Sequence, residues 1–354
     1  LTTTGNYNTG VGYQALAQNT TSSQNTAVGA YALDANTTAA NNTAVGYNSL
    51  SANTTGTSNT GVGQAALQTN TTAANNTALG KSALAYNTTG DSNTAVGKDA
   101  LGSNTTAAGN TAVGGLALST NTTSGENTAV GYASLEVNTG ASNTAVGYSA
   151  LDSNTTGTLN TAVGANALDA NTTGVYNTGI GAGALGANTT ANNNTAVGRS
   201  CMAVNTTGHS NVAVGSDALD ANTTAIRNTA VGHAALSSNT TANENTAVGW
   251  QALTANTTGI SNVAMGVGAM AASTTGTANV SLGQNSLHAG TDPDSNVAIG
   301  YDALRNHTEN NNIAIGHSAM KTSTTGGQNV CVGDAALRDG SGFIHCVAVG
   351  AEAL

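Results

Sequence analysis

A seventeen-residue phrase repeats along the whole chain, and this period limits the possible folds more than any other feature. Copies begin at residues 8, 25, 42 and so on to 346, with two shorter steps of sixteen residues that reach Asn143 and Asn312. We therefore expect one continuous array over residues 1–354, with a partial coil at each end. Helical repeats need about 33 residues or more for two helices and their turns, so the period excludes them.

Comparison of the copies shows which positions of the repeat are fixed. The fifth residue is always Gly, the fourth is aliphatic or Met, the ninth is Leu or Met, and the third and eighth are small. This pattern predicts an all-β fold, a parallel β-solenoid (β-roll) of about 21 coils in which each residue lies above its own copy. In the coil that begins at Asn42 we expect two short strands, Thr43–Gly46 and Ser49–Thr54, with Gly46 in a turn conformation that a Cβ would forbid. We expect the Asn positions to hydrogen-bond along the stack.

The first expected strand has two different faces. Because side chains alternate along a strand, Thr43 and Val45 point to one face, and Ala44 and Gly46 point to the other. In later copies the Thr becomes Val or Ile, so the first face grows more apolar while the second stays uniformly small. A strand buried on both sides indicates several chains bundled around an axis, and we expect a homotrimer.

Composition excludes several classes of partner. The formal net charge is −10 and the seven Lys and Arg residues are scattered, so they form no basic stripe for nucleic acid. No run of 18 apolar residues is present to span a bilayer, so we expect no membrane insertion within this segment. So polar and Gly-rich a chain is typical of disorder, but its strict period is not. Three cysteines are too few for a disulfide framework.

The phrase N-T-A-V-G-x-x-A-L followed by N-T-T-G resembles the head repeats of trimeric autotransporter adhesins, whose shorter units carry a similar V-A-I-G core. It is also similar to the repeat-rich tail fibre domain proteins of bacteria and their viruses, which carry NTA-[VI]-G and NTTG phrases in long arrays. The resemblance covers all 354 residues. It implies a left-handed parallel β-roll that is homotrimeric and is exposed on the surface of a cell or a virion.

The sequence offers no arrangement of residues for catalysis. The six histidines are scattered over several positions of the repeat, and no HExxH, CxxC or phosphate-binding loop ending in Gly-Lys-Ser/Thr occurs. We therefore expect no enzyme activity, no catalytic residues and no cofactor. Asp292 and Asp294, in the segment GTDPDSN, are candidate calcium ligands, although two carboxylates beside a proline also suit an ordinary turn.

The Asn-Thr-Thr phrase creates a series of N-glycosylation sequons. If the Asn side chains face outward, a row of glycans would coat the solenoid; the alternative is an Asn and Thr ladder that closes the turn without sugar. The candidate glycosylation sites are Asn19, Asn36, Asn53, Asn70, Asn87, Asn104, Asn121, Asn154, Asn171, Asn188, Asn205, Asn222, Asn239 and Asn256.

Two further functions stay open as alternatives. Solenoids with flat rows of Thr order water, so ice binding is one of them; here Asn53 and Thr55 would share a face of the second expected strand. The other alternative is recognition of glycans or a host surface through the variable sixth position of the repeat. The aromatic residues at that position include Tyr13, Tyr47, Tyr132, Tyr148 and Trp250.

The two ends of the chain carry complementary parts of a coil. Leu1–Tyr7 supplies seven residues and Cys346–Leu354 supplies nine, which together match the sixteen of the short coils. This match suggests head-to-tail joining of subunits into a filament, the alternative being a segment cut from a longer array. The sequence as a whole predicts an extracellular structural fibre, the shaft or head of a surface filament, adhesin or tail fibre. Its expected partners are other copies of itself, with surface glycans as a further candidate.

Overall fold

The chain forms an all-β parallel solenoid with a repeat of about 17 residues, and the residues described contain no helix. The structure is a computed structural model that describes residues 4–339 and 342–353. The chain divides between Tyr176 and Asn177 into two compact units, each considered by itself below. The sequence repeat continues across this point, because Asn177 begins a copy seventeen residues after Asn160. One continuous array therefore stays a prediction.

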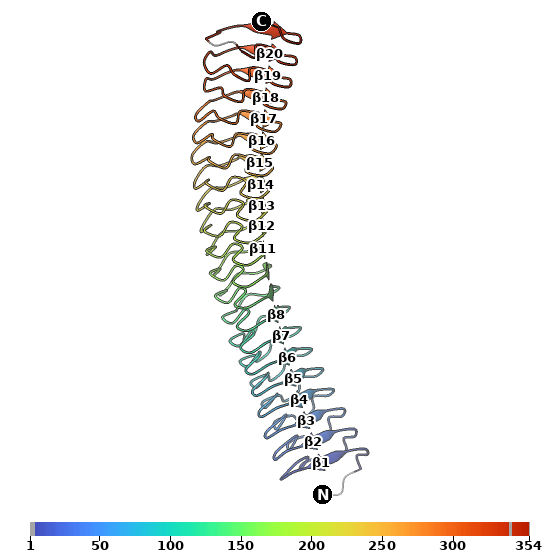
Figure 1. The fold of residues 1–354 in the computed structure, drawn as a ribbon. Helices are drawn as coiled ribbons and strands as arrows, with labels where there is room; N and C mark the ends of the chain where they lie inside the picture. The colour runs from blue at the N-terminus through green and yellow to red at the C-terminus, as the bar shows by residue number, and fades with distance from the viewer. Residues whose placement is uncertain (1–3, 340–341, 354) are drawn as a thin grey trace. The chain divides into compact units, whose positions relative to one another are not determined.

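The first unit contains ten strands of three residues each among the residues described, one for each coil. Every strand pairs in parallel with the strand of the next coil. Figure 1 shows the coils of this unit in blue to green. The strands are β1 (Thr9–Val11), β2 (Thr26–Val28), β3 (Thr43–Val45), β4 (Thr60–Val62), β5 (Thr77–Leu79), β6 (Thr94–Val96), β7 (Thr111–Val113), β8 (Thr128–Val130), β9 (Thr144–Val146) and β10 (Thr161–Val163).

The second unit is built in the same way, with eleven three-residue strands in its described part. Here too each strand pairs in parallel with its neighbour along the chain. The strands are β11 (Thr178–Ile180), β12 (Thr195–Val197), β13 (Val212–Val214), β14 (Thr229–Val231), β15 (Thr246–Val248), β16 (Val263–Met265), β17 (Val280–Leu282), β18 (Val297–Ile299), β19 (Ile313–Ile315), β20 (Val330–Val332) and β21 (Val347–Val349).

The register confirms that each residue lies on its own copy. Val45 of β3 lies opposite Val62 of β4, as the repeat predicts. The two sixteen-residue steps do not disturb this register: Thr128 lies opposite Thr144, and Val297 lies opposite Ile313. The missing residue is therefore absorbed outside the strand.

The interior of each coil is filled by the small third and eighth residues and by the ninth residue. In the coil that begins at Asn42, Ala44, Ser49 and Leu50 are fully buried. The Ser49 hydroxyl donates a hydrogen bond to the Gly61 carbonyl oxygen of the next coil at 2.8 Å. Full burial of one Leu stabilises a coil by about 1.5–3 kcal/mol, and the Leu row repeats this contribution along the stack.

The prediction of a second strand over Ser49–Thr54 is wrong. Those residues form turns, because Asn48 and Leu50 have positive φ angles of 56° and 51°. The αL conformation costs a non-Gly residue about 1–2 kcal/mol, so local preference opposes it. Hydrogen bonds between coils hold it in place: the Leu50 amide donates to the Ala66 carbonyl oxygen at 3.0 Å, and the Asn48 amide donates to the Ala30 carbonyl oxygen at 3.1 Å.

The prediction for Gly46 is confirmed. Its φ is 135°, and a Cβ at this position would lie 2.5 Å from the Gly63 carbonyl oxygen of the next coil. The invariant glycine therefore meets two needs at once, a backbone conformation that L side chains rarely adopt and close contact between coils.

Two ladders of buried Asn side chains run inside the coils, as expected. In the first, the Asn42 amide donates to Asn25 Oδ1 and Asn42 Nδ2 donates to the Gly56 carbonyl oxygen, both at 2.9 Å. In the second, Asn53 Nδ2 donates to Asn36 Oδ1 at 3.1 Å and to the same Gly56 oxygen at 2.9 Å. The coil that begins at Asn42 is thus closed internally by amide hydrogen bonds, which satisfy groups that would be costly to bury alone.

The second Asn ladder is interrupted in two places. Among the residues described, Asn121 Oδ1 and Asn256 Oδ1 are buried without a hydrogen-bond partner. After Asn121 comes the short coil, where Asn138 Nδ2 donates instead to the Gly140 carbonyl oxygen at 2.7 Å. After Asn256 the ladder position is occupied by Ser273, whose hydroxyl is also unpartnered. The shorter coil after Asn121 and the shorter side chain of Ser273 therefore have the same consequence, an Asn oxygen of the ladder that lacks a hydrogen-bond partner.

Candidate assembly face

The two outer residues of each strand form the candidate functional surface. From β2 to β21 the middle residue of the strand is buried, and the two residues beside it are partly or fully exposed. We call this row of outer strand residues, the second and fourth positions of the repeat, the Thr/Val face. It confirms the expected separation of Val45 from Ala44, with Ala44 directed into the coil.

The aliphatic residues of the Thr/Val face are partly open to solvent. Val214, Met265 and Ile315 are exposed by 38, 44 and 37 percent, which leaves a large part of each side chain uncovered. None of the described strands contains a charged residue. Large exposed apolar patches often mark surfaces for association, so this row is the candidate functional surface in each unit.

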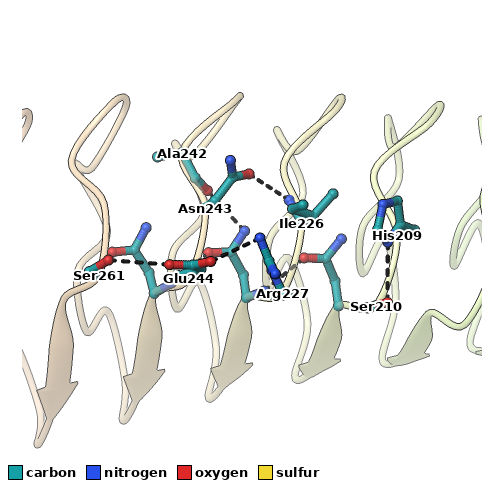
Figure 2. A network of polar contacts seen from close by, with 11 residues as sticks. His209, Ser210, Ile226, Arg227, Ala242, Asn243, Glu244 and Ser261 are labelled. Atoms are coloured by element: carbon teal, nitrogen blue, oxygen red, sulfur yellow. Dashed lines mark hydrogen bonds and ion pairs between the residues drawn. The ribbon is translucent and has the colours of Figure 1, made fainter.

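Charged residues lie elsewhere in the repeat, where they connect adjacent coils. Figure 2 shows Arg227, Glu244 and Ser261 in one row from three successive coils, at the position just before the coil Asn. The Arg227 guanidinium pairs with the Glu244 carboxylate at 2.9 Å, and the Ser261 hydroxyl donates to the same carboxylate at 3.5 Å. Each of these exposed pairs contributes little to the free energy of unfolding, so the stacking of the coils does not depend on them.

The sixth position of the repeat faces solvent, as predicted. Some of its aromatic rings meet other rings along the stack: Tyr132 and Tyr148 are stacked with their centroids 5.9 Å apart, and Tyr13 meets Tyr31, a seventh-position residue, edge to face at 5.4 Å. The predicted surface aromatic residues are all more than half exposed, namely Tyr13, Tyr47, Tyr132, Tyr148 and Trp250.

The candidate glycosylation sites lie inside the solenoid and not on its surface. All fourteen Asn side chains are buried. The sugar of an N-glycan is attached to Nδ2, yet Asn53 Nδ2 is used in the Asn ladder. The alternative interpretation, a ladder that closes the turn, therefore describes the folded coil. Glycosylation stays a prediction, and attachment of a sugar at Asn53 would have to break the ladder hydrogen bond of Nδ2.

The Asn-x-Thr row considered for ice binding does not form on the surface. Asn53 is fully buried, whereas Thr55 is exposed, so the two residues do not share a face. The reason is again the turn conformation of this segment, which replaces the alternation of an extended strand.

The carboxylates of Asp292 and Asp294 make hydrogen bonds with the preceding coil. Asp292 Oδ1 accepts from the hydroxyls of Thr274 and Thr275 at 2.8 and 2.6 Å. Those bonds hold the pKa of Asp292 below its usual range. Asp294 Oδ1 accepts from the Thr277 amide at 2.7 Å. Both side chains therefore staple one loop to the next.

The remaining candidate reactive groups are the three cysteines. Cys201, Cys331 and Cys346 are free thiols, and burial raises the pKa of Cys201 to about 12 and that of Cys331 to about 11. Within residues 4–339 and 342–353, no group of three or more His, Cys, Asp or Glu side chains is placed to hold a metal ion. The same residues include no helix suited by length and apolar character to crossing a membrane.

Sequence analysis missed the role of His307. This residue takes the place of Asn in the second ladder and is fully buried. Its Nε2 accepts a hydrogen bond from Asn312 Nδ2 at 2.8 Å, so Nδ1 carries the proton and donates to the Ser323 carbonyl oxygen at 3.1 Å. The signal was present in the repeat, since His307 occupies the position of Asn53 in its own coil.

The fold defines the chain as a β-solenoid repeat protein. Neither a scan against protein-family models nor a search of curated proteins found a match to this chain.

Proposed function

We propose that this chain is a non-enzymatic structural fibre whose solenoids associate side by side through the Thr/Val face. The observation that carries the proposal is the half-exposed aliphatic residue of each strand, repeated in register along both units. Covering such residues contributes on the order of 1 kcal/mol for each coil, so the gain grows with the number of coils. A long row exceeds the cost of association where a single coil would not.

The partner proposed for this face is a second copy of the same chain. Strands in a sheet are spaced by about 4.7–4.9 Å, and the outer side chains follow that spacing. Only a partner with the same spacing along the solenoid axis can pack its side chains between those of this face over many coils. An identical solenoid meets this requirement, and the uncharged strands impose no repulsion between copies.

The number of chains and the location follow from the resemblance to trimeric autotransporter adhesins and tail fibre repeats. Three copies would enclose the Thr/Val faces around one axis and leave the charged and aromatic positions outward. Such a fibre belongs outside the cell, as the shaft or head of a surface filament, adhesin or tail fibre.

Sedimentation equilibrium of the chain tests the proposal directly. We expect a homo-oligomer at micromolar concentration, and a cryo-EM cross-section with three chains. Replacement of Val62, Val96 and Val130 by Lys should weaken the oligomer while the far-UV spectrum stays unchanged, because these side chains point out of the coil.

The matched control is Gln64→Lys in the same coil as Val62. Its position is the exposed sixth one, where Lys81 and Lys98 occur naturally in neighbouring coils. This variant should associate as the unaltered chain does. A monomer at every concentration, or equal effects of the Val and Gln replacements, would show that the Thr/Val face does not mediate association.

Recognition of surface glycans is the second candidate function. It is favoured by the exposed aromatic clusters, in which Tyr132 and Tyr148 present stacked rings to solvent. Aromatic rings with one open face provide apolar contact area beside a polar tip. Loss of binding to a glycan array in Tyr132→Ala and Tyr148→Ala would support this function, and an unreactive fibre would argue against it.

A further inference from the structure

An open cleft lies in the first unit, on a part of the coil distinct from the Thr/Val face. Its volume is about 350 Å³, and it crosses the coils that begin at Asn59, Asn76, Asn93 and Asn110. Small residues at the tenth position of the repeat, Ala85 and Gly102, leave this space between the larger Gln68 and Ser119. The volume is within the range of small-molecule sites, which begins at about 300 Å³.

Tyr86 gives this cleft an aromatic wall. The Tyr86 amide donates to the Gly102 carbonyl oxygen at 3.2 Å, which places the tyrosine directly beside the residue that lacks a side chain. The Gly102 amide in turn donates to the Asp99 carbonyl oxygen at 3.2 Å and so brings Asp99 to the same place. We call this space, lined by Tyr86, Asp99, Gly102 and Leu116 among others, the Tyr86 cleft.

The Tyr86 ring is open to a ligand. It is 63 percent exposed. Within the described chain it stacks on no other ring, unlike Tyr132 and Tyr148, and its hydroxyl makes no hydrogen bond there. No other copy of the repeat has an aromatic residue at this eleventh position, where Ser103 and Thr120 occupy the following coils. The coil therefore does not need a tyrosine here for its own packing.

We propose that the Tyr86 cleft binds a neutral pyranose sugar. One face of a pyranose ring is formed by C–H groups that fit against an aromatic ring, while its hydroxyls both donate and accept hydrogen bonds. The lining offers matching groups: the Asp99 carboxylate as an acceptor, the Gln68 amide as donor and acceptor, and the Ser119 hydroxyl as either. Leu116 adds apolar contact area to the lining.

The charges around the cleft favour a neutral sugar over an anionic one. No cationic side chain lines the cleft. Lys98, the residue before the lining residue Asp99, pairs its Nζ with Asp99 Oδ2 at 3.4 Å, so the pair presents no net charge. A sialic acid or a nucleotide phosphate would lack the Arg or Lys partner that such anions require. A free cation would meet only one carboxylate, which is already paired.

This assignment goes beyond side-by-side association and does not depend on it, because no residue of the Thr/Val face lines the cleft. It also differs from recognition by the sixth-position aromatic residues. The combination of an aromatic eleventh residue and a glycine tenth residue in the next coil occurs once in the sequence, so one site is expected for each chain. Recognition by the aromatic clusters would give several.

The test is binding of neutral sugars to the full chain. The probes are methyl glycosides of glucose, galactose, mannose and N-acetylglucosamine, followed by an array of neutral oligosaccharides built from them. Saturation-transfer NMR detects millimolar binding, and titration gives the number of sites. We expect one site for each chain, with affinity lowered about tenfold or more in Tyr86→Ala and in Gly102→Gln. The second variant fills the cleft while Tyr86 itself is not substituted. Gln68 shows that the repeat accepts Gln at this position.

Matched controls separate this site from the other surfaces. Tyr176→Ala removes a tyrosine of similar exposure that lies outside the cleft and outside the sixth position, and Gly186→Gln fills the tenth position of a coil in the second unit. Both should bind as the unaltered chain does. Binding lost in Tyr148→Ala but kept in Tyr86→Ala would move recognition to the aromatic clusters and overturn the proposal. Absence of binding to every neutral sugar would overturn it as well, whatever the oligomeric state.

Discussion

In the first unit every strand begins with Thr, whereas in β16 to β21 every strand begins with Val or Ile. The interior does not change in the same way: Leu101 in the first unit and Leu304 in the second are equally buried. The Leu position and the middle strand position, which point inward, are therefore constrained by the coil in the same way in both regions. The outward strand positions are free of that constraint, so they can vary with what covers the coil from outside.

The second Asn ladder changes over the same stretch. It is continuous through most of the first unit but ends at Asn256, after which Ser273, Gly290, His307 and Ser323 take its place. The four coils that begin at Asn262, Asn279, Asn296 and Asn312 thus lack the Asn of the second ladder, and their Thr/Val face is more apolar. We infer that they depend more on association with another copy than the coils of the first unit do.

The largest expected effect tests whether the backbone of the two regions is the same. A Cβ at Gly114 would lie 2.3 Å from the Gly131 carbonyl oxygen, and one at Gly283 would lie 2.4 Å from that of Gly300. Gly114→Val and Gly283→Val should therefore each cost more than about 4 kcal/mol of local stability, because backbone strain adds to the clash. Hydrogen exchange of the adjacent coils measures this loss.

Gly115→Val is the matched control. Gly115 is the next residue, its nearest neighbour is the flexible Tyr132 ring at 3.5 Å, and Val267 occupies the same position in another coil. This change should cost less than about 1 kcal/mol. If only one of the two Gly→Val variants were damaging, the claim of a common interior would be wrong.

The next effect concerns the outward face. Lys replacements on β18, β19 and β20 should weaken association about a hundredfold or more, and the same number on β4, β6 and β8 should weaken it about tenfold. The difference arises because the C-terminal strands present two aliphatic residues each and the first-unit strands present one. Sedimentation equilibrium compares Ile299, Ile315 and Val332 with Val62, Val96 and Val130. Equal losses would contradict the inferred dependence on association.

Much of the coil could be predicted from the sequence, because its determinants recur in every copy. The burial of Leu50, the conformation of Gly46 and the Asn ladder all follow from the requirement that each residue lies on its own copy. The αL conformation of Leu50 could not be predicted, since local preference opposes it and only the hydrogen bond to the next coil holds it. The Tyr86 cleft depends on residues of adjacent coils together, which the repeat pattern of a single coil does not reveal.

A smaller effect tests the role of the Asn ladder. Ser273→Asn should stabilise its coil by about 1–3 kcal/mol, because the new amide would donate to Asn256 Oδ1, which is buried without a partner. It would also reach the Gly276 carbonyl oxygen, as Asn256 reaches that of Gly259 at 3.0 Å. Urea denaturation and hydrogen exchange measure the gain.

Ser323→Asn is the control for this change. The residue one coil before Ser323 is His307, which has no amide oxygen to accept the new hydrogen bond. The gain should therefore be smaller than at Ser273. Equal gains in both variants would mean that the ladder contact is not the source of the stability.

The smallest expected effect comes from His307, and it appears only when the pH falls below neutral. Burial lowers the pKa of His307 below its usual range, while Glu309 and the carbonyl oxygens of Ser323 and Gly326 oppose that shift. The folded coil therefore keeps the imidazole neutral, and protonation would make Nε2 a donor facing the Asn312 donor. The unfolded chain binds the proton near pH 6.5, so stability is complete above that pH. It should fall as the pH drops below 6.5, by at most about 1.4 kcal/mol for each pH unit, until the folded state is protonated as well.

Hydrogen exchange of residues 296–311 as a function of pH measures the loss, and His307→Asn, which restores the ladder residue, should remove it. A pH dependence that persists in His307→Asn would assign the acid sensitivity to other groups.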